Sequence, residues 1–231
     1  MSLANQILLY NTTLDFTSPL PEGIHIMNPF KESEFIEKIC TSFYHKFYQD
    51  SHQRYIILGI NPGRLGAGAT GLPFTDSKRL VSECDLENPG FLTHEPSSVF
   101  MYEMINAFGG VKEFYAQFYI NSVFPLGFIK KKADGKVVNY NYYDDIGLQK
   151  MLIPYIVNHL QHQIKMCRQN KVVFCLGSGK NFNFLNQLNK EYKLFDEVVP
   201  LEHPRYIMQY KLKQKSMYID QYLTAFATYI Q

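Results

Sequence analysis

The sequence predicts an α/β protein, a three-layer α/β/α sandwich with a central, mostly parallel four-stranded sheet. Three observations predict it. Short apolar runs alternate with longer segments of helical periodicity. The apolar runs are continuous, as in strands buried on both faces. Apolar residues make up 46% of the 231 residues, and no linker or repeat divides them, so we expect a single domain over residues 1–231.

The elements can be justified in chain order. Residues 1–30 are punctuated by prolines and glycine, so we expect an irregular amino-terminal segment. Apolar side chains at spacings of three and four predict a helix over residues 31–48. The run RYIILGI then predicts a buried strand over 54–60, which ends at a proline and a glycine. Similar patterns predict helices over 99–108, 146–168, 180–189 and 210–229, strands over 118–126, 171–177 and 195–201, and a polar, basic loop over 127–143.

The charge, the lack of targeting signals and the spacing of possible metal ligands limit the possible functions. The net charge of +2 neither establishes nor excludes a nucleic-acid partner, and the run Lys130, Lys131 and Lys132 is as compatible with a solvated surface as with a binding site. No apolar stretch approaches the ~20 residues of a membrane span, and no signal peptide is evident. We therefore expect a cytoplasmic protein with no membrane partner, associated with the nucleoid if its source is bacterial. His159 and His162 have no evident third ligand and are interpreted as helix surface, so we expect no metal and no cofactor.

Polar residues follow several of the predicted strands. In a parallel sheet, ligands bind beyond the carboxyl ends of the strands. The Gly-rich segment 59–74 places Asn61 after the first strand, Asn121 lies in the second, and His203 follows the last. Each residue also has a structural interpretation: a tight turn for Asn61, backbone contacts for Asn121, and an ordinary capped surface position for His203. The ring of Phe74 could equally belong to the core.

Three segments together resemble a known family. Residues 59–74 read G-I-N-P-G-R-L-G-A-G-A-T-G-L-P-F, followed later by N-S-V-F-P-L and H-P-R. This combination resembles the uracil-DNA glycosylase superfamily, and within it the single-strand-selective monofunctional (SMUG-like) branch, whose first segment reads G-M-N-P-G-P-[FW]-G-M-A-Q-T-G-V-P-F. The resemblance covers residues ~55 to ~206, and the first segment is its most specific part.

The resemblance implies a monofunctional DNA glycosylase of base excision repair. Such an enzyme flips uracil or a related damaged base out of DNA and hydrolyses its N-glycosidic bond. By family position, Asn61 would hold the attacking water, Asn121 would read the base edge, and Phe74 would stack on the flipped ring. His203 would donate to uracil O2 as negative charge grows there. Gly63 would leave room for the base, in a pocket completed by Gly59, Ile60 and Pro62.

The resemblance also implies contacts with DNA, as a single or double strand. Arg205 and Tyr206 would wedge into the space that the base leaves, and Lys130, Lys131 and Lys132 would contact phosphate. A monomer is expected. This sequence departs from the family in lacking the S-P of H-P-S-P-R and in having Arg64 and Ala69 for Pro and Gln. Two rivals therefore stay open: a catalytically weak module that binds DNA or modified bases, and a small-molecule enzyme using the Gly-rich loop for phosphate.

Overall fold

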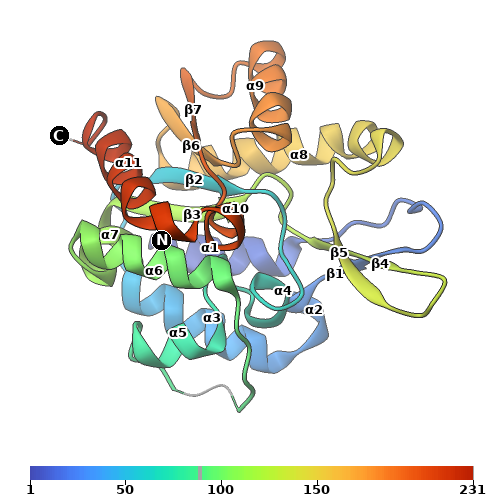
Figure 1. The fold of residues 1–231 in the computed structure, drawn as a ribbon, viewed down its shortest axis with the longest axis horizontal. Helices are drawn as coiled ribbons and strands as arrows, with labels where there is room; N and C mark the ends of the chain where they lie inside the picture. Colours follow the sequence, from blue (N-terminus) through green and yellow to red (C-terminus); the bar gives the residue numbers. More distant parts are fainter. Residues whose placement is uncertain (88–89, 231) are drawn as a thin grey trace.

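The central sheet has the predicted form. The structure is a computed structural model that describes residues 1–87 and 90–230 (Figure 1). Four strands pair in parallel in the order β3-β2-β6-β7. The predicted α/β class and four-stranded parallel sheet are confirmed. The strands are β2 (Tyr55–Gly59), β3 (Phe118–Ser122), β6 (Val172–Leu176) and β7 (Glu197–Leu201).

Helices cover both faces of this sheet, and β3 shows how neighbouring residues divide between them. Phe118 packs against Phe226 of α11 (Lys215–Ala227), with ring centroids 4.4 Å apart. The next residue, Tyr119, packs instead against Tyr48, which ends α3 (Glu34–Phe47), at 6.1 Å. Successive strand side chains point to opposite faces. The remaining helices are α1 (Leu3–Thr13), α2 (Pro29–Glu32), α4 (Ala67–Thr70), α5 (Ser77–Ser82), α6 (Pro96–Phe108), α7 (Val111–Gln117), α8 (Ile146–Cys167), α9 (Lys180–Tyr192), α10 (Pro204–Tyr210) and the 3₁₀ turn Leu212–Gln214.

The amino-terminal segment differs from its prediction. Residues 1–30 are not irregular: they contain α1, which Ser2 caps, and the strand β1 (Ile24–Met27). Leu3, Ala4 and Ile7 of α1 are buried in the core. The apolar side of this helix is weakly patterned, and tertiary packing rather than local preference stabilises such a short helix.

The basic segment 127–143 also differs from its prediction. It is not a loop but an antiparallel hairpin of β4 (Gly127–Lys131) and β5 (Val137–Tyr140), which β1 extends to a second, three-stranded sheet. The hairpin projects from the side of the molecule (Figure 1). Its turn holds Asp134 and Gly135, with Gly135 at φ +80°, and Asp-Gly between two strands is a recognised hairpin signal.

One prediction about helix α8 was wrong. His159 is 1% exposed, so its assignment to the helix surface was wrong, whereas His162 is exposed. Asp145 caps the helix, because its side chain accepts from the backbone N–H of Leu148 at 2.7 Å. Within the described residues, no helix combines the length and apolar character that crossing a membrane requires.

Candidate active site

A cavity of about 310 Å³ opens at the carboxyl ends of the parallel strands. It lies between the Gly-rich loop after β2, the end of β3, the start of α10 after β7, and the strand β5 of the hairpin. This is where ligands bind in parallel sheets. Eight of the predicted site residues line it: Ile60, Asn61, Pro62, Gly63, Phe74, His203, Arg205 and Tyr206.

The amide of Asn61 is fixed by two backbone groups at and beyond the end of β5. Its Nδ2 donates to the carbonyl oxygen of Tyr140 at 3.1 Å, and its Oδ1 accepts from the N–H of Tyr142 at 3.1 Å. Tyr142 is itself anchored, because its hydroxyl donates to Asn181 Oδ1 at 2.7 Å. The two hydrogen bonds therefore distinguish the amide nitrogen of Asn61 from its oxygen, and they hold the side chain at the cavity wall.

Phe74 lies beside His203, and Gly59 makes room for its ring. The two rings are 5.9 Å apart between centroids. Phe74 has a backbone φ of +55°, a conformation that residues other than glycine adopt rarely. A Cβ on Gly59 would lie 3.0 Å from Phe74 Cε2, closer than such contacts normally are. Gly59 is thus buried behind the ring and acts on the cavity through Phe74.

His203 is held as a neutral donor. It caps α10, and its Nδ1 accepts from the backbone N–H of Arg205 at 3.1 Å, which leaves the proton on Nε2. Burial, helped by the charge of Arg205, lowers the pKa of His203 to about 4. At neutral pH the imidazole can therefore donate one hydrogen bond from Nε2 without carrying a charge.

Asn121 is not brought into this cavity. Its Nδ2 donates to the hydroxyl of Tyr119 at 2.8 Å, and its Oδ1 accepts from its neighbour's backbone N–H, so it faces a small space of about 10 Å³ behind the Gly-rich loop. Ser122, the next residue of β3, lines the main cavity instead. Strand alternation puts the two on opposite faces. The prediction that the Asn121 amide reads the base edge is therefore at odds with its placement.

The predicted DNA-contacting residues lie at the rim or beyond it. Arg205 and Tyr206 belong to the first turn of α10 rather than to a loop, and both are exposed and line the cavity mouth. Lys130, Lys131 and Lys132 belong to the hairpin, are exposed and do not line the cavity.

The hairpin still connects these lysines to the cavity. Lys130 pairs with Val138 in the hairpin register, directly beside Asn139, which lines the cavity. The lysines thus continue the cavity wall outward.

Sequence reasoning missed several polar residues of the wall. Ser122, Asn139, Asn141 and Gln209 carry no motif of their own, because non-local contacts bring them together. Glu95, the residue before α6, was missed for the same reason. Asp-Gly in the hairpin was the available signal for Asn139, since it places this strand beside the Gly-rich loop.

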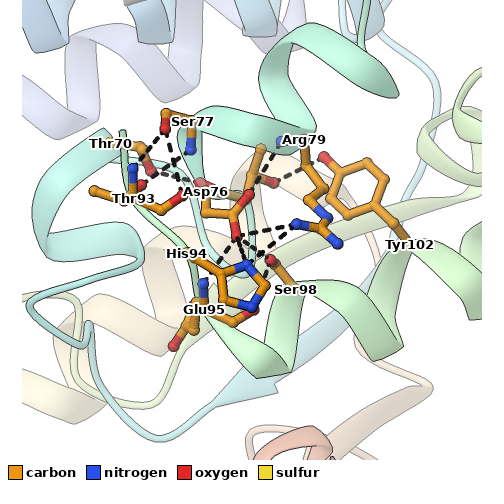
Figure 2. A network of polar contacts seen from close by, with 10 residues as sticks. Thr70, Asp76, Ser77, Arg79, Thr93, His94, Glu95, Ser98 and Tyr102 are labelled. Carbon is orange, nitrogen blue, oxygen red and sulfur yellow. Dashed lines mark hydrogen bonds and ion pairs between the residues drawn. The ribbon is translucent and has the colours of Figure 1, made fainter. Parts of the chain in front are cut away.

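Glu95 is positioned by a network around a buried carboxylate, that of Asp76 (Figure 2). Asp76 is 0% exposed, and its Oδ2 accepts from the backbone N–H of Glu95 at 2.9 Å and from the Ser98 hydroxyl at 2.7 Å. Arg79 lies 3.5 Å from the same oxygen. These contacts fasten the chain before α6 against the start of α5, so the backbone of Glu95 is fixed at the cavity.

The fold and the cavity define a class. A parallel α/β/α sandwich carries, at the carboxyl ends of its strands, an aromatic ring, a neutral imidazole donor and a fixed amide around a space of nucleobase size, as in hydrolases that act on a base.

The comparisons place the chain within that class. The model of the uracil DNA glycosylase superfamily matches residues 45–227, and the chain belongs to this family. It is similar to the crystal structure of wild-type SMUG2 of Pedobacter heparinus, with 53% sequence identity over 99% of this chain and 98% of that one, and a TM-score of 0.96. No curated protein matches it. The SMUG-like resemblance and the assignment as a hydrolase of N-glycosyl bonds, of the uracil-DNA glycosylase type, are confirmed.

Proposed function

We propose that this protein is a monofunctional DNA glycosylase that removes uracil or a related damaged base from DNA. The observation that carries the proposal is the meeting of Asn61, Phe74 and His203 around one cavity of base size. Of the residues that the structure describes, no lysine lines this cavity. A Schiff base with the sugar, and hence strand cleavage, is therefore not expected.

The cavity residues divide the work of excision. Phe74 stacks on the flipped ring, a contact worth about 1–3 kcal/mol. His203 donates from Nε2 to a base carbonyl oxygen as the departing base becomes anionic, and one such donor is worth about 2.7–4 kcal/mol. Asn61 holds the attacking water through Oδ1, which retains a lone pair beyond the bond from the Tyr142 N–H. The fixed amide positions the water without taking its proton.

Ser122 replaces Asn121 as the β3 side chain that meets the base. A hydroxyl can donate to a carbonyl or accept from an amine, whereas a held amide presents one fixed pattern. Recognition through Ser122 therefore constrains the base less than an amide would. We expect the enzyme to accept several deaminated bases, with Gly63 leaving space for substituted ones.

DNA runs across the cavity mouth in this proposal. Arg205 and Tyr206 lie where a flipped base leaves its stack, and Lys130, Lys131 and Lys132 continue from the rim along the hairpin. Phosphate contacts through lysine and arginine make binding weaken as salt rises. The monomeric state belongs to the same proposal.

Base excision tests the function directly. Single- and double-stranded oligonucleotides with one uracil, hydroxymethyluracil, xanthine or hypoxanthine are incubated with the protein, and abasic sites are cleaved with alkali. We expect cleavage that Asn61→Ala and His203→Ala both greatly reduce, with His203→Ala affecting excision far more than binding. Salt-sensitive DNA binding without cleavage of any substrate would instead indicate the binding module. Absence of both would refute the proposal.

A further inference from the structure

Glu95 contributes the only carboxyl group that lines the cavity in the described part of the chain. Although it occupies the N-cap position of α6, its side chain does not cap that helix. Its carboxylate accepts no hydrogen bond from any described residue, whereas its backbone N–H is held by Asp76. The side chain is therefore turned to the cavity with its hydrogen-bonding capacity unused.

The carboxyl group lies directly against the Gly-rich loop that carries Asn61. A Cβ on Gly66 would overlap Glu95 Oε2, so only glycine allows this approach. A Cβ on Gly63 would lie 3.7 Å from Glu95 Oε1 and 3.4 Å from Asn139 Nδ2. Gly63 is two residues after Asn61, and Asn61, Gly63 and Glu95 all line the same cavity.

We infer that Glu95 is a catalytic residue, the general base that receives the proton of the water held by Asn61. The inference rests on the proposed function. Asn61 cannot accept the proton, because a neutral amide is a very weak base and its two polar atoms already bond to backbone groups. Among the described residues of the wall, Glu95 is the one group that both lacks a hydrogen-bond partner and can bind a proton at neutral pH.

The step balances with groups present at the site. The bond between the sugar C1′ and the base nitrogen breaks, and its electron pair leaves with the base, whose developing charge His203 stabilises. The water oxygen forms the new bond to C1′ while its proton passes to the Glu95 carboxylate. Glu95 then returns the proton to solvent or to the departed base, which completes hydrolysis.

The surroundings of Glu95 suit this role. Burial, and next the negative charge of Asp76, raise the pKa of Glu95 to about 7, against a lowering effect of Arg205. A general base is most effective when its pKa lies near the working pH. The nearby side chains of Arg79 and His94 contact Asp76 rather than Glu95. His203, across the cavity, stays neutral in this pH range.

The test is the pH dependence of single-turnover excision for the wild type and Glu95→Gln. The wild-type rate should rise with pH around 7 and then level off, because only the carboxylate accepts the proton. Glu95→Gln should lower the plateau rate by about 10²–10⁴-fold and abolish the rise, with DNA affinity changed less than about threefold. Glu95→Gln keeps the side-chain shape and removes no hydrogen bond, so folding should be preserved, as thermal unfolding will show.

Matched variants separate the possible outcomes. Glu103→Gln makes the same change on α6 at an ion pair with Lys215 outside the cavity, and it should behave as wild type. Asn61→Ala should lower the rate at every pH while keeping the rise. A wild-type rate and pH profile in Glu95→Gln would overturn the inference and leave the proposed function intact. Absence of excision by the wild type on every substrate would overturn both.

Discussion

At the scale of single residues, the alternation of β3 decides which side chain reaches the cavity. Asn121 bonds to Tyr119 on the face covered by α3, while Ser122 lines the cavity. A motif that matches Asn by sequence alone does not record which of the two neighbouring side chains faces the cavity. The hydrogen-bond partners of Asn121 are therefore the reason for proposing Ser122 as the base contact.

The two neighbours should therefore respond differently to truncation. Ser122→Ala should lower uracil excision by about tenfold, the effect of removing one hydrogen bond of about 1.4 kcal/mol, with little change in stability. Asn121→Ala should cost about 1 kcal/mol of unfolding free energy with excision largely retained, because it removes a buried structural bond. Single-turnover rates and urea unfolding of both variants measure this. If Asn121→Ala lowered excision and Ser122→Ala did not, Asn121 rather than Ser122 would contact the base.

Gly59 offers a second residue-scale prediction, since a methyl group there would press on the Phe74 ring. Gly59→Ala should weaken binding of uracil-containing DNA by a fraction of the ~1–3 kcal/mol that base stacking contributes. In a Phe74→Ala background the same change should add little, because its effect passes through the ring. A double-mutant cycle of binding constants measures the coupling. Additive effects would show that Gly59 acts elsewhere.

At the scale of elements, the hairpin carries the charge that DNA should meet. Replacing Lys130, Lys131 and Lys132 with alanine should reduce the slope of log binding constant against log salt. On duplex DNA the reduction should reach about 0.9 for each phosphate that the hairpin no longer neutralises. Excision at saturating enzyme should change little, since these lysines do not line the cavity.

The matched control for the hairpin lysines is a set of three lysines at the other end of the sheet, where the strands begin. Lys171 precedes β6, and Lys190 and Lys193 are at the end of α9, so the three are exposed at the amino ends of the strands. Replacing these with alanine changes the net charge equally. A salt slope that falls as much in this control would assign the effect to overall charge rather than to the hairpin.

The elements also show how much of the fold the sequence predicts. The strands β2, β3 and β6 were predictable because each is a buried, largely apolar run, a pattern that few other structures produce. The strand β7 is only partly buried, and the apolar residues Val198, Val199 and Leu201 indicated it. The hairpin was missed because its strands are short and half exposed, so only the Asp-Gly turn signalled them. Helix α1 was missed because tertiary packing stabilises it.

The site was predictable to a similar extent. Asn61, Phe74 and His203 were found because each lies in a motif at a strand end. Glu95 and Ser122 depend on long-range placement and register, which no local pattern records.

At the scale of the whole molecule, buried titratable groups make stability depend on pH in opposite directions. Burial lowers the pKa of His203 to about 4 and that of His159 to about 3, from 6.5. The unfolded chain then binds more protons below pH 6.5, so these histidines reduce stability as pH falls. Glu95 acts oppositely: its pKa rises from 4.5 to about 7, so the native state binds the extra proton and stability from this group is lost as pH rises through that window.

Replacing Glu95 should therefore make the unfolding free energy decrease more steeply as the pH falls. Between pH 4.5 and 6.5 the two histidines contribute a slope of about 2.7 kcal/mol per pH unit and Glu95 opposes it with about 1.4, one proton each. Glu95→Gln removes the opposing part, so its unfolding free energy should fall more steeply toward acid than that of the wild type, by about 1.4 kcal/mol per pH unit. Urea unfolding at a series of pH values, with Glu103→Gln as control, measures both slopes. Parallel curves would mean that the native pKa of Glu95 is not raised, which would also remove the electrostatic support for its role as the base.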